Sequence, residues 1–271
     1  MQDSNKLDIL HSHSYSGVTM SPLSKCPVVY TVAYVNFEKT IINLYKLFPN
    51  VHFVPMSNFL KKQFKLNWTN VVHNGINAGK FVLPKKENRN MFICIGRIVP
   101  EKGIHIATKY CSDKNIKLKI AGPISDQEYF TKKIKPFLGK YVSYVGELNF
   151  KEKIKFYQEA KALLNPLQYN EAFGNTMIEA MACGTPIIAF NKGSVPEVVK
   201  DQKTGFIVNN IKELGLKINK ISEINSLDCR SRVLDNFTYQ KMAENYEEIY
   251  YKILRQKNED SNCQILQWFT Q

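Results

Sequence analysis

Short apolar segments rich in β-branched residues alternate along this chain with longer stretches whose apolar positions recur at helical spacing. Short apolar runs are typical of buried strands, and the stretches between them are long enough for helices. This alternation predicts βα units around parallel sheets, an α/β fold. The expected strands are 7–11, 27–32, 51–56, 70–73, 91–96, 116–122, 141–146, 162–166, 186–190 and 205–208. Helices are expected over 36–47, 58–66, 103–112, 126–137, 150–160, 174–183, 195–200 and 210–220, with more than one helix in 227–257.

The polar stretch LPKKENRN at 83–90 interrupts the apolar pattern, which then restarts with a strand. A chain of 271 residues exceeds the usual size of one domain. We therefore predict a first domain over 1–84, a second domain over 85–257 that includes the C-terminal helices, and a tail over 258–271. Parallel sheets bind ligands at the carboxyl ends of their strands, so the site is expected in a cleft between the two domains.

Two features of the composition predict a cytoplasmic protein. No apolar run approaches the roughly 20 residues that cross a bilayer, and the first residues, MQDSNKLDIL, lack the layout of a signal peptide. The six cysteines are scattered without a Cys-x-x-Cys pair, which favours buried free thiols over disulfides or metal ligands.

The formal charge of +13 favours a negatively charged partner, such as a nucleotide, a nucleic acid or an anionic membrane surface. Composition does not choose among these three. Lysine runs occur at 61–65, 132–135 and 151–155, where the alternative is the solvated face of a surface helix.

The segment NEAFGNTMIEAMACGTPIIAF at 170–190 is the most informative part of the sequence. It predicts a loop with Glu171, a helix whose first turn holds Gly174, Asn175 and Thr176, and a buried strand. A glycine at a helix start lets a ligand approach the free N–H groups, which suit a phosphate. Carboxylates accept hydroxyl hydrogen bonds, as recognition of a sugar or ribose requires. Glu171 and Glu179 are expected at different ends of one pocket, although an exposed helix residue is an equal alternative for Glu179.

Two further segments carry candidate chemistry. In MFICIGRIVPEKGIHIA at 91–107, the chain turns at Gly96 after a strand and presents Arg97 and Lys102, two cations that can clamp a diphosphate. In LHSHSYSG at 10–17, we expect His11 and His13 to point to opposite faces, which argues against a shared metal ion. A structural role is the alternative for a histidine at the end of a strand.

Together these segments resemble family 4 of the retaining glycosyltransferases, which have the GT-B fold of two Rossmann-like domains facing a cleft. EAFGNTMIE resembles the family's E-x7-E signature, and AMACGTPIIAF, GSVPEVV and TGFIV follow it in the family's order. Upstream, GRIVPEKG resembles the phosphate loop, VVHNGIN the segment closing the first domain, and SNFLKKQF the helix before it. The resemblance extends from about residue 7 to about residue 255.

The resemblance implies roles for individual residues. Gly96, Arg97 and Lys102 would contact the donor diphosphate, together with the backbone of the loop and helix start formed by Phe173, Gly174, Asn175 and Thr176. Glu179 would bind the ribose, Glu171 the donor sugar, and the backbone near Gly146 and Glu147 the base, while His13 would lie near the reacting sugar. The implied reaction retains anomeric configuration and uses no metal or organic cofactor, and the sequence contains no Asp-x-Asp motif of the metal-dependent GT-A enzymes.

Two departures from the family qualify this prediction. Ala33 stands where many members have a histidine, and the family's opening βα units, with a glycine-rich first loop, have no counterpart here. We therefore expect a shortened first domain whose residues 7–32 present an unpaired sheet edge and favour self-association. The leading hypothesis is sugar transfer from a nucleotide-diphosphate sugar, with uridine preferred, to a glycan or lipid-linked acceptor.

The alternative function is nucleotide-sugar binding with little or no transfer. Peripheral contact with an anionic membrane is a further expectation from the charge. A nucleic-acid-binding function is disfavoured because no recognised nucleic-acid motif accompanies the charge.

Overall fold

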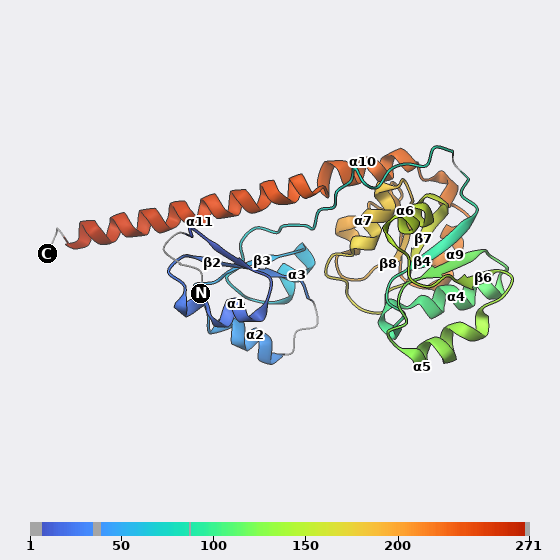
Figure 1. The fold of residues 1–271 in the computed structure, drawn as a ribbon, viewed down its shortest axis with the longest axis horizontal. Helices are drawn as coiled ribbons and strands as arrows, with labels where there is room; N and C mark the ends of the chain where they lie inside the picture. The colour runs from blue at the N-terminus through green and yellow to red at the C-terminus, as the bar shows by residue number, and fades with distance from the viewer. Residues whose placement is uncertain (1–6, 35–38, 87, 269–271) are drawn as a thin grey trace. The chain divides into compact units, whose positions relative to one another are not determined.

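The computed structural model describes residues 7–34, 39–86 and 88–268, and the chain divides into two compact units. The first unit comprises residues 1–73 and 240–271, and the second comprises 74–239. Each unit has its own parallel sheet (Figure 1). This division differs from the predicted one, which placed the boundary at 84/85 and assigned the final helices to the second domain. Residues 83–86 and 88–90 of the polar stretch form a connection inside the second unit.

The sheet of the first unit has the strand order β1-β2-β3, and both pairings are parallel. Its strands are β1 (Leu10–Ser12), β2 (Val28–Val32) and β3 (His52–Pro55). Its shorter helices are α1 (Tyr15–Thr19), η2 (Ser21–Leu23), α2 (Lys39–Lys46) and α3 (Asn58–Gln63). Residues 36–38 of the helix predicted over 36–47 lie outside the described residues.

Two apolar clusters cover the two faces of this sheet, because successive residues of β2 point in opposite directions. One face presents Val28, Tyr30 and Val32 to side chains from α1 and α2. The other presents Val29 to Ile249 and Ile253 of α11 (Tyr239–Trp268). The final helix, α11, belongs with the first unit because its apolar residues are buried against the sheet of that unit. The predicted tail 258–271 is helical as far as Trp268.

Two predicted strands of the first unit differ from the observed structure. The first begins at Leu10 instead of residue 7. The strand predicted over 70–73 is absent, although Val72 is buried. Val72 donates one backbone hydrogen bond to the Pro55 carbonyl (3.1 Å), and Thr69 donates one to Phe53 (2.9 Å). The apolar pattern at 70–73 therefore reflects burial beside β3, without the regular hydrogen-bond ladder of a strand.

The second unit has a six-stranded parallel sheet with the order β6-β5-β4-β7-β8-β9. The strands are β4 (Met91–Ile95), β5 (Leu118–Ala121), β6 (Val142–Tyr144), β7 (Ala160–Asn165), β8 (Ile187–Phe190) and β9 (Gly205–Val208). The chain starts at the central β4, winds outward to β6, and crosses back to place β7 beside β4. This is the doubly wound arrangement, with its topological switch point between β4 and β7.

Helices and short turns connect these strands. They are η3 (Pro100–Lys102), α4 (Ile104–Asp113), α5 (Gln127–Tyr129), η4 (Phe130–Ile134), η5 (Lys135–Phe137), α6 (Phe150–Gln158), α7 (Asn175–Ala182), α8 (Val195–Val198), α9 (Ile211–Ile218), η6 (Ile221–Glu223) and α10 (Ser226–Asn236). A capping box between Asn149 and Glu152 fixes the start of α6. The positions after 226 form two helices, α10 and α11, in agreement with the prediction of more than one.

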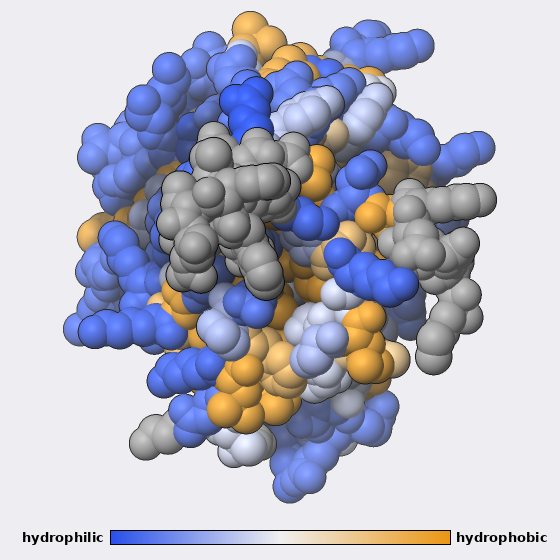
Figure 2. Space-filling model, turned by 90° about the vertical axis from the view of Figure 1, so that its left-hand side faces the viewer, coloured by the Kyte–Doolittle hydropathy of each residue, from blue (hydrophilic) through white to orange (hydrophobic). Residues whose placement is uncertain are grey.

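Burial and surface character complete the description of the two units. Cys26, Cys94, Cys111, Cys183 and Cys229 are buried and free, as predicted, and Cys263 lies outside the described side chains. None of the described helices combines the length and apolar character needed to cross a membrane. Leu23 and Leu47 of the first unit are 74% and 72% exposed. Figure 2 shows apolar side chains interspersed with polar ones on the face that it displays.

Candidate functional site

Glycines follow the first three strands of the second unit at the carboxyl edge of its sheet. Gly96, Gly122 and Gly146 all have positive φ, and two hydrogen bonds link this edge. The N–H of Gly96 donates to the Ala121 carbonyl (3.0 Å), and that of Gly122 donates to the Gly146 carbonyl (2.9 Å). A Cβ at Gly122 would lie 2.0 Å from the Gly96 oxygen, whereas Gly96 and Gly146 face open space. The edge is therefore bare backbone that a ligand can approach.

Lys102 and Glu171 meet at the switch point of the sheet, where ligands of doubly wound folds bind. Lys102 lies at the end of the loop after β4, and Glu171 lies in the loop after β7. The Lys102 Nζ is 2.9 Å from the Glu171 Oε2, and the glutamate side chain is only 15% exposed. The sequence placed both residues in the site but did not predict their ion pair.

Tyr169 completes this cluster and was not identified from the sequence. Its hydroxyl accepts a hydrogen bond from the Lys102 Nζ (2.5 Å) and donates one to the Glu171 Oε2. Burial, reinforced by the charge of Glu171, raises the Tyr169 pKa well above its usual value, so the phenol stays protonated as a donor. Its position in the loop that follows β7, beside the switch point, is the signal that could have found it.

Backbone contacts hold the two loops of this cluster together. The Gln168 N–H donates to the Glu101 carbonyl (2.8 Å), and the Ser194 N–H donates to the Glu171 carbonyl (2.9 Å). A Cβ at Gly103 would lie 1.9 Å from the Pro166 oxygen, so only glycine allows this approach. The cation of one loop and the carboxylate of the other are thus positioned by the backbone before any ligand arrives.

Arg97 is exposed on the loop after β4. Within the described residues 7–34, 39–86 and 88–268 it makes no hydrogen bond or ion pair. It lies near enough to Tyr169 for its charge to oppose the rise in that residue's pKa. Arg97 is therefore a cation beside the Lys102 cluster that is available to an anionic ligand.

The amino terminus of α7 is open. The residue before the helix, Gly174, has φ of 87°, and no side chain caps the first turn. Asn175 is exposed, Thr176 is half-buried, and the Asn175 Oδ1 accepts a hydrogen bond from Asn74 (3.0 Å). The uncapped N–H groups and the positive end of the helix are the groups with which the sequence predicts an anion to interact.

Glu179 lies one turn further along the same helix as Asn175. Its side chain is 14% exposed and carries two hydrogen bonds, from the Lys153 Nζ (2.9 Å) and from the Tyr157 hydroxyl (2.8 Å). The alternative of an exposed helix residue is therefore wrong. Lys153 and Tyr157 were missed by sequence reasoning, although their spacing of four on α6 places them on one helical face.

Glu171 and Glu179 have separate partners in the structure. Lys102 and Tyr169 hold the first, while Lys153 and Tyr157 hold the second. Burial, together with the charge of Glu179, raises the Tyr157 pKa well above its usual value, which keeps this phenol a donor. Two carboxylates held independently can bind different parts of one ligand.

The remaining predicted residues of the second unit contribute differently. Gly146 faces open space at the end of β6, and its neighbour Glu147 is exposed. Phe173, by contrast, is 2% exposed and packs against Phe237 with ring centroids 5.6 Å apart. The Phe173 side chain therefore supports the loop from within the core.

His13 belongs to the first unit, where its exposed ring stacks on His11 with centroids 4.5 Å apart. The expectation that these rings point to opposite faces is wrong, because residues two apart in an extended chain share a face. His11 Nδ1 is 2.6 Å from the Tyr250 hydroxyl, and its Nε2 is 2.8 Å from the Thr31 hydroxyl. Burial, with a smaller effect of His13, lowers the His11 pKa to about 4. Among the described residues, no group of three or more His, Cys, Asp or Glu is placed to hold a metal ion.

Comparison with known proteins gives a family match that covers the second unit. A family model described as Glycosyl transferases group 1 matches residues 76–236. An uncharacterized glycosyltransferase from Methanocaldococcus jannaschii is 27% identical over 73% of this chain and 58% of its own length. The capsular polysaccharide biosynthesis glycosyltransferase CapM from Staphylococcus aureus is 30% identical over 68% of this chain and 54% of its own length. The chain thus spans somewhat more than half the length of these two relatives.

Solved structures share the fold. A glycosyltransferase from Rickettsia africae superposes with a TM-score of 0.79 at 22% identity, covering 92% of this chain and 78% of that one. Anabaena HepE, solved in complex with UDP and glucose, superposes with a TM-score of 0.78 at 18% identity, covering 89% of this chain and 77% of that one. The GT-B class of α/β fold predicted from the sequence is confirmed by these likenesses.

Proposed function

Since the chain belongs to the glycosyl transferases group 1 family, we propose that it transfers a sugar from a nucleotide-diphosphate sugar to a glycan or lipid-linked acceptor. The observation that carries this proposal is the carboxyl edge of the second unit's sheet. There, bare glycine backbone, the Lys102–Glu171 pair and an uncapped helix start adjoin one another at the switch point. These groups suit a ligand that has both phosphates and hydroxyls.

Each part of the donor is assigned to groups of matching chemistry. Arg97, Lys102 and the N–H groups at the start of α7 bind the diphosphate, because they supply positive charge and hydrogen-bond donors. Glu171 binds sugar hydroxyls and Glu179 binds ribose hydroxyls. Each carboxylate receives two hydrogen bonds from the described residues and has about four acceptor positions, so each retains acceptor capacity. The backbone at Gly146 and Glu147 contacts the base.

The proposed reaction retains configuration at the anomeric carbon. The bond from that carbon to the diphosphate oxygen breaks, and the acceptor oxygen bonds to the same face of the sugar. The acceptor's proton passes to a phosphate oxygen of the leaving nucleoside diphosphate. Arg97 and Lys102 stabilise the negative charge that develops on this leaving group, so the proposal includes no metal or organic cofactor. His13 is assigned to the reacting sugar on the family resemblance alone.

Uridine diphosphate is the preferred nucleotide in this proposal. Anabaena HepE, which shares the fold, has been solved in complexes with UDP and with UDP-glucose. A second candidate function is binding of the nucleotide sugar without transfer. It is favoured by one observation, that every group assigned to the donor except His13 lies within the second unit.

Calorimetry with UDP, followed by a turnover assay, tests the proposal. Arg97→Ala removes a charged donor worth about 1.5–3 kcal/mol, so UDP should bind roughly 10- to 150-fold more weakly. Arg255→Ala, at an exposed arginine of α11, is the matched control and should leave UDP affinity unchanged. Unchanged affinity in Arg97→Ala would reject the diphosphate assignment.

The turnover assay separates the two candidate functions. It measures UDP release from UDP-glucose with and without glycan acceptors. Acceptor-dependent release supports transfer. Tight UDP binding with no release for any acceptor supports the binding-only function.

A further inference from the structure

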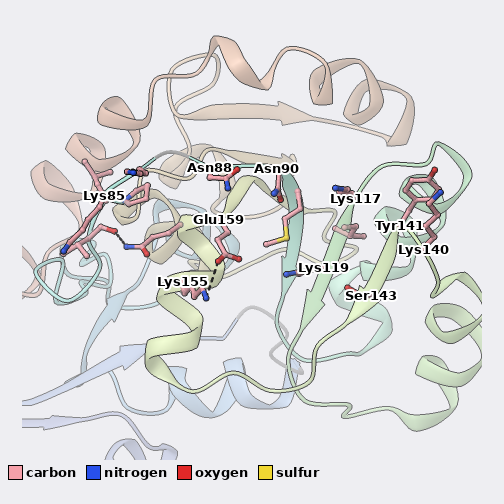
Figure 3. A pocket seen from close by; sticks show the side chains of 17 residues that line it. Lys85, Asn88, Asn90, Lys117, Lys119, Lys140, Tyr141, Ser143, Lys155 and Glu159 are labelled. Atoms are coloured by element: carbon pink, nitrogen blue, oxygen red, sulfur yellow. Dashed lines mark hydrogen bonds and ion pairs between the residues drawn. The ribbon is translucent and has the colours of Figure 1, made fainter.

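A polar hollow lies at the amino edge of the second unit's sheet, opposite the carboxyl edge that carries the candidate site. Its volume is about 800 Å³, which is within the range of small-molecule sites. Residues from the connection 82–90, from the starts of β4, β5 and β6, and from the carboxyl end of α6 line it. Figure 3 shows labelled side chains from these elements around the hollow. None of the residues assigned to the donor belongs to this lining.

The charge of the hollow is strongly one-sided. Six lysines and one glutamate are among its described lining residues: Lys85, Lys86, Lys117, Lys119, Lys140, Lys155 and Glu159. Glu159 is 3.7 Å from Lys155, and this is an exposed helical pair (Figure 3). Lys140 contacts the ring of Tyr141. Most of the ammonium groups around the hollow therefore have no carboxylate partner among the described residues.

Lys119 shows that the hollow interrupts the normal covering of the sheet. Strands of parallel sheets are usually buried on both faces. Ile93, Lys119 and Ser143 are register partners on β4, β5 and β6, so they share one face. Ile93 is fully buried, whereas Lys119 and Ser143 are only half-buried. The helices that cover this face over β4 therefore do not extend over β5. Lys119, in the middle of β5, lies at the bottom of the hollow.

The donor groups around the hollow indicate the chemistry of a ligand. Ammonium groups are compact charges with three donors each, and here they come from four separate segments of the chain. This arrangement suits tetrahedral phosphate groups, whose oxygens accept from many directions, better than a planar carboxylate. Asn88, Asn90 and Ser143 add neutral donors. Because Lys119 lies at the recessed bottom of the hollow, a compact solute reaches it more readily than a bilayer surface does.

We propose that this amino-edge hollow is a second ligand site, which binds a compact soluble molecule carrying two or more phosphate groups. It is separate from the donor site, because Lys117 and Gly122 lie roughly 16 Å apart along an extended strand at ~3.3 Å per residue. A ligand in the hollow and a nucleotide at the carboxyl edge can therefore bind at the same time.

The test is a calorimetric titration of the full chain with inorganic tripolyphosphate, at low ionic strength and with saturating UDP present. UDP occupies the proposed donor site, so any remaining binding reports on a different place. The test variant is Lys117→Gln/Lys119→Gln. The matched control is Lys109→Gln/Lys132→Gln, which removes the same charge from lysines that pair with carboxylates on exposed helical surfaces.

We expect tripolyphosphate to bind with one-to-one stoichiometry. The test variant should bind it roughly tenfold more weakly or worse, and the control should stay within about twofold. Lys117→Arg/Lys119→Arg, which keeps the charge, should retain most of the affinity. Affinity should fall with added salt, because these lysines are largely solvent-accessible.

Three results would overturn the proposal. Equal losses in the test and control variants would show a diffuse charge effect. Displacement of tripolyphosphate by UDP would place its binding at the donor site. Sedimentation with phosphatidylcholine vesicles containing phosphatidic acid, without any tripolyphosphate binding, would assign the lysines to a lipid surface instead. Circular dichroism melts of all three variants exclude unfolding as the cause of a loss.

Discussion

Neutralising Glu179 gives the sharpest test of the donor site, because this carboxylate is held by two donors and still has acceptor capacity for ribose hydroxyls. Hydrogen bonds to charged groups contribute about 1.5–3 kcal/mol and neutral ones about 0.5–1.5 kcal/mol. Glu179→Gln removes the charge, so each of two hydrogen bonds from ribose hydroxyls would change from a bond to a charged group into a neutral one. The summed loss of about 2–3 kcal/mol predicts roughly 30- to 150-fold weaker binding of UDP.

The pattern across ligands distinguishes the ribose role from a general effect. Uridine and UDP should weaken by the same factor in calorimetry, whereas inorganic pyrophosphate should bind as it does to the unaltered chain. The new amide also places donors beside Lys153, so the variant should lose about 1–2 kcal/mol of stability, or roughly 2–8 °C in Tm. Binding must therefore be measured well below this transition. Glu128→Gln, at an exposed glutamate on α5, is the control.

A loss of pyrophosphate affinity equal to the loss of uridine affinity would refute the ribose assignment. Unchanged uridine affinity would show that Glu179 serves the structure by pairing with Lys153 and Tyr157.

Three other predictions concern turnover, pH and the first unit. Turnover should persist in a metal chelator, and activity abolished by the chelator and restored by manganese would contradict charge neutralisation by Arg97 and Lys102. Because the His11 pKa is lowered to about 4, its stabilising effect should be present above the unfolded value near 6.5 and be lost as pH falls from about 6.5 to 4. Chemical denaturation should show this slope in the unaltered chain and a smaller one in His11→Asn. Hydrogen exchange should be faster in 7–32 than in 91–190, or the chain should self-associate, because β1 pairs only with β2 among the described residues. A monomer with equal protection in both regions would contradict this last prediction.

The sheet of the second unit was predictable because each of its strands is a short apolar run between helical stretches. The proximity of Lys102 and Glu171 was predictable for the same reason, since both residues follow the strands that flank the switch point. Local sequence could not indicate that Tyr169 bridges these two residues. The bridge depends on loops separated by tens of residues that meet through the Gln168–Glu101 backbone contact.

The errors in the first unit have a common physical origin. Apolar residues at 70–73 predicted a strand, but Val72 is buried beside β3 through isolated hydrogen bonds. Apolar residues of α11 predicted a helix correctly, but not which sheet they cover. Periodicity reports that a face is buried, and it does not report the partner that buries it. The compact units include α11 with the first sheet, unlike the predicted domains, because Ile249 and Ile253 pack on that sheet.

The two edges of the second sheet differ in how their positive charges are balanced. At the carboxyl edge, Lys102 and Lys153 each pair with a glutamate, so a ligand must exchange with existing contacts. Selectivity for a ligand with both hydroxyls and phosphates follows, because such a ligand can satisfy the carboxylates and the cations together. At the amino edge, Lys117 and Lys119 lack such partners among the described residues, so phosphate groups alone should suffice. Hydroxyl-rich neutral sugars cannot satisfy the cations, so they should compete only weakly with UDP-glucose at the first edge and have no effect on tripolyphosphate at the second.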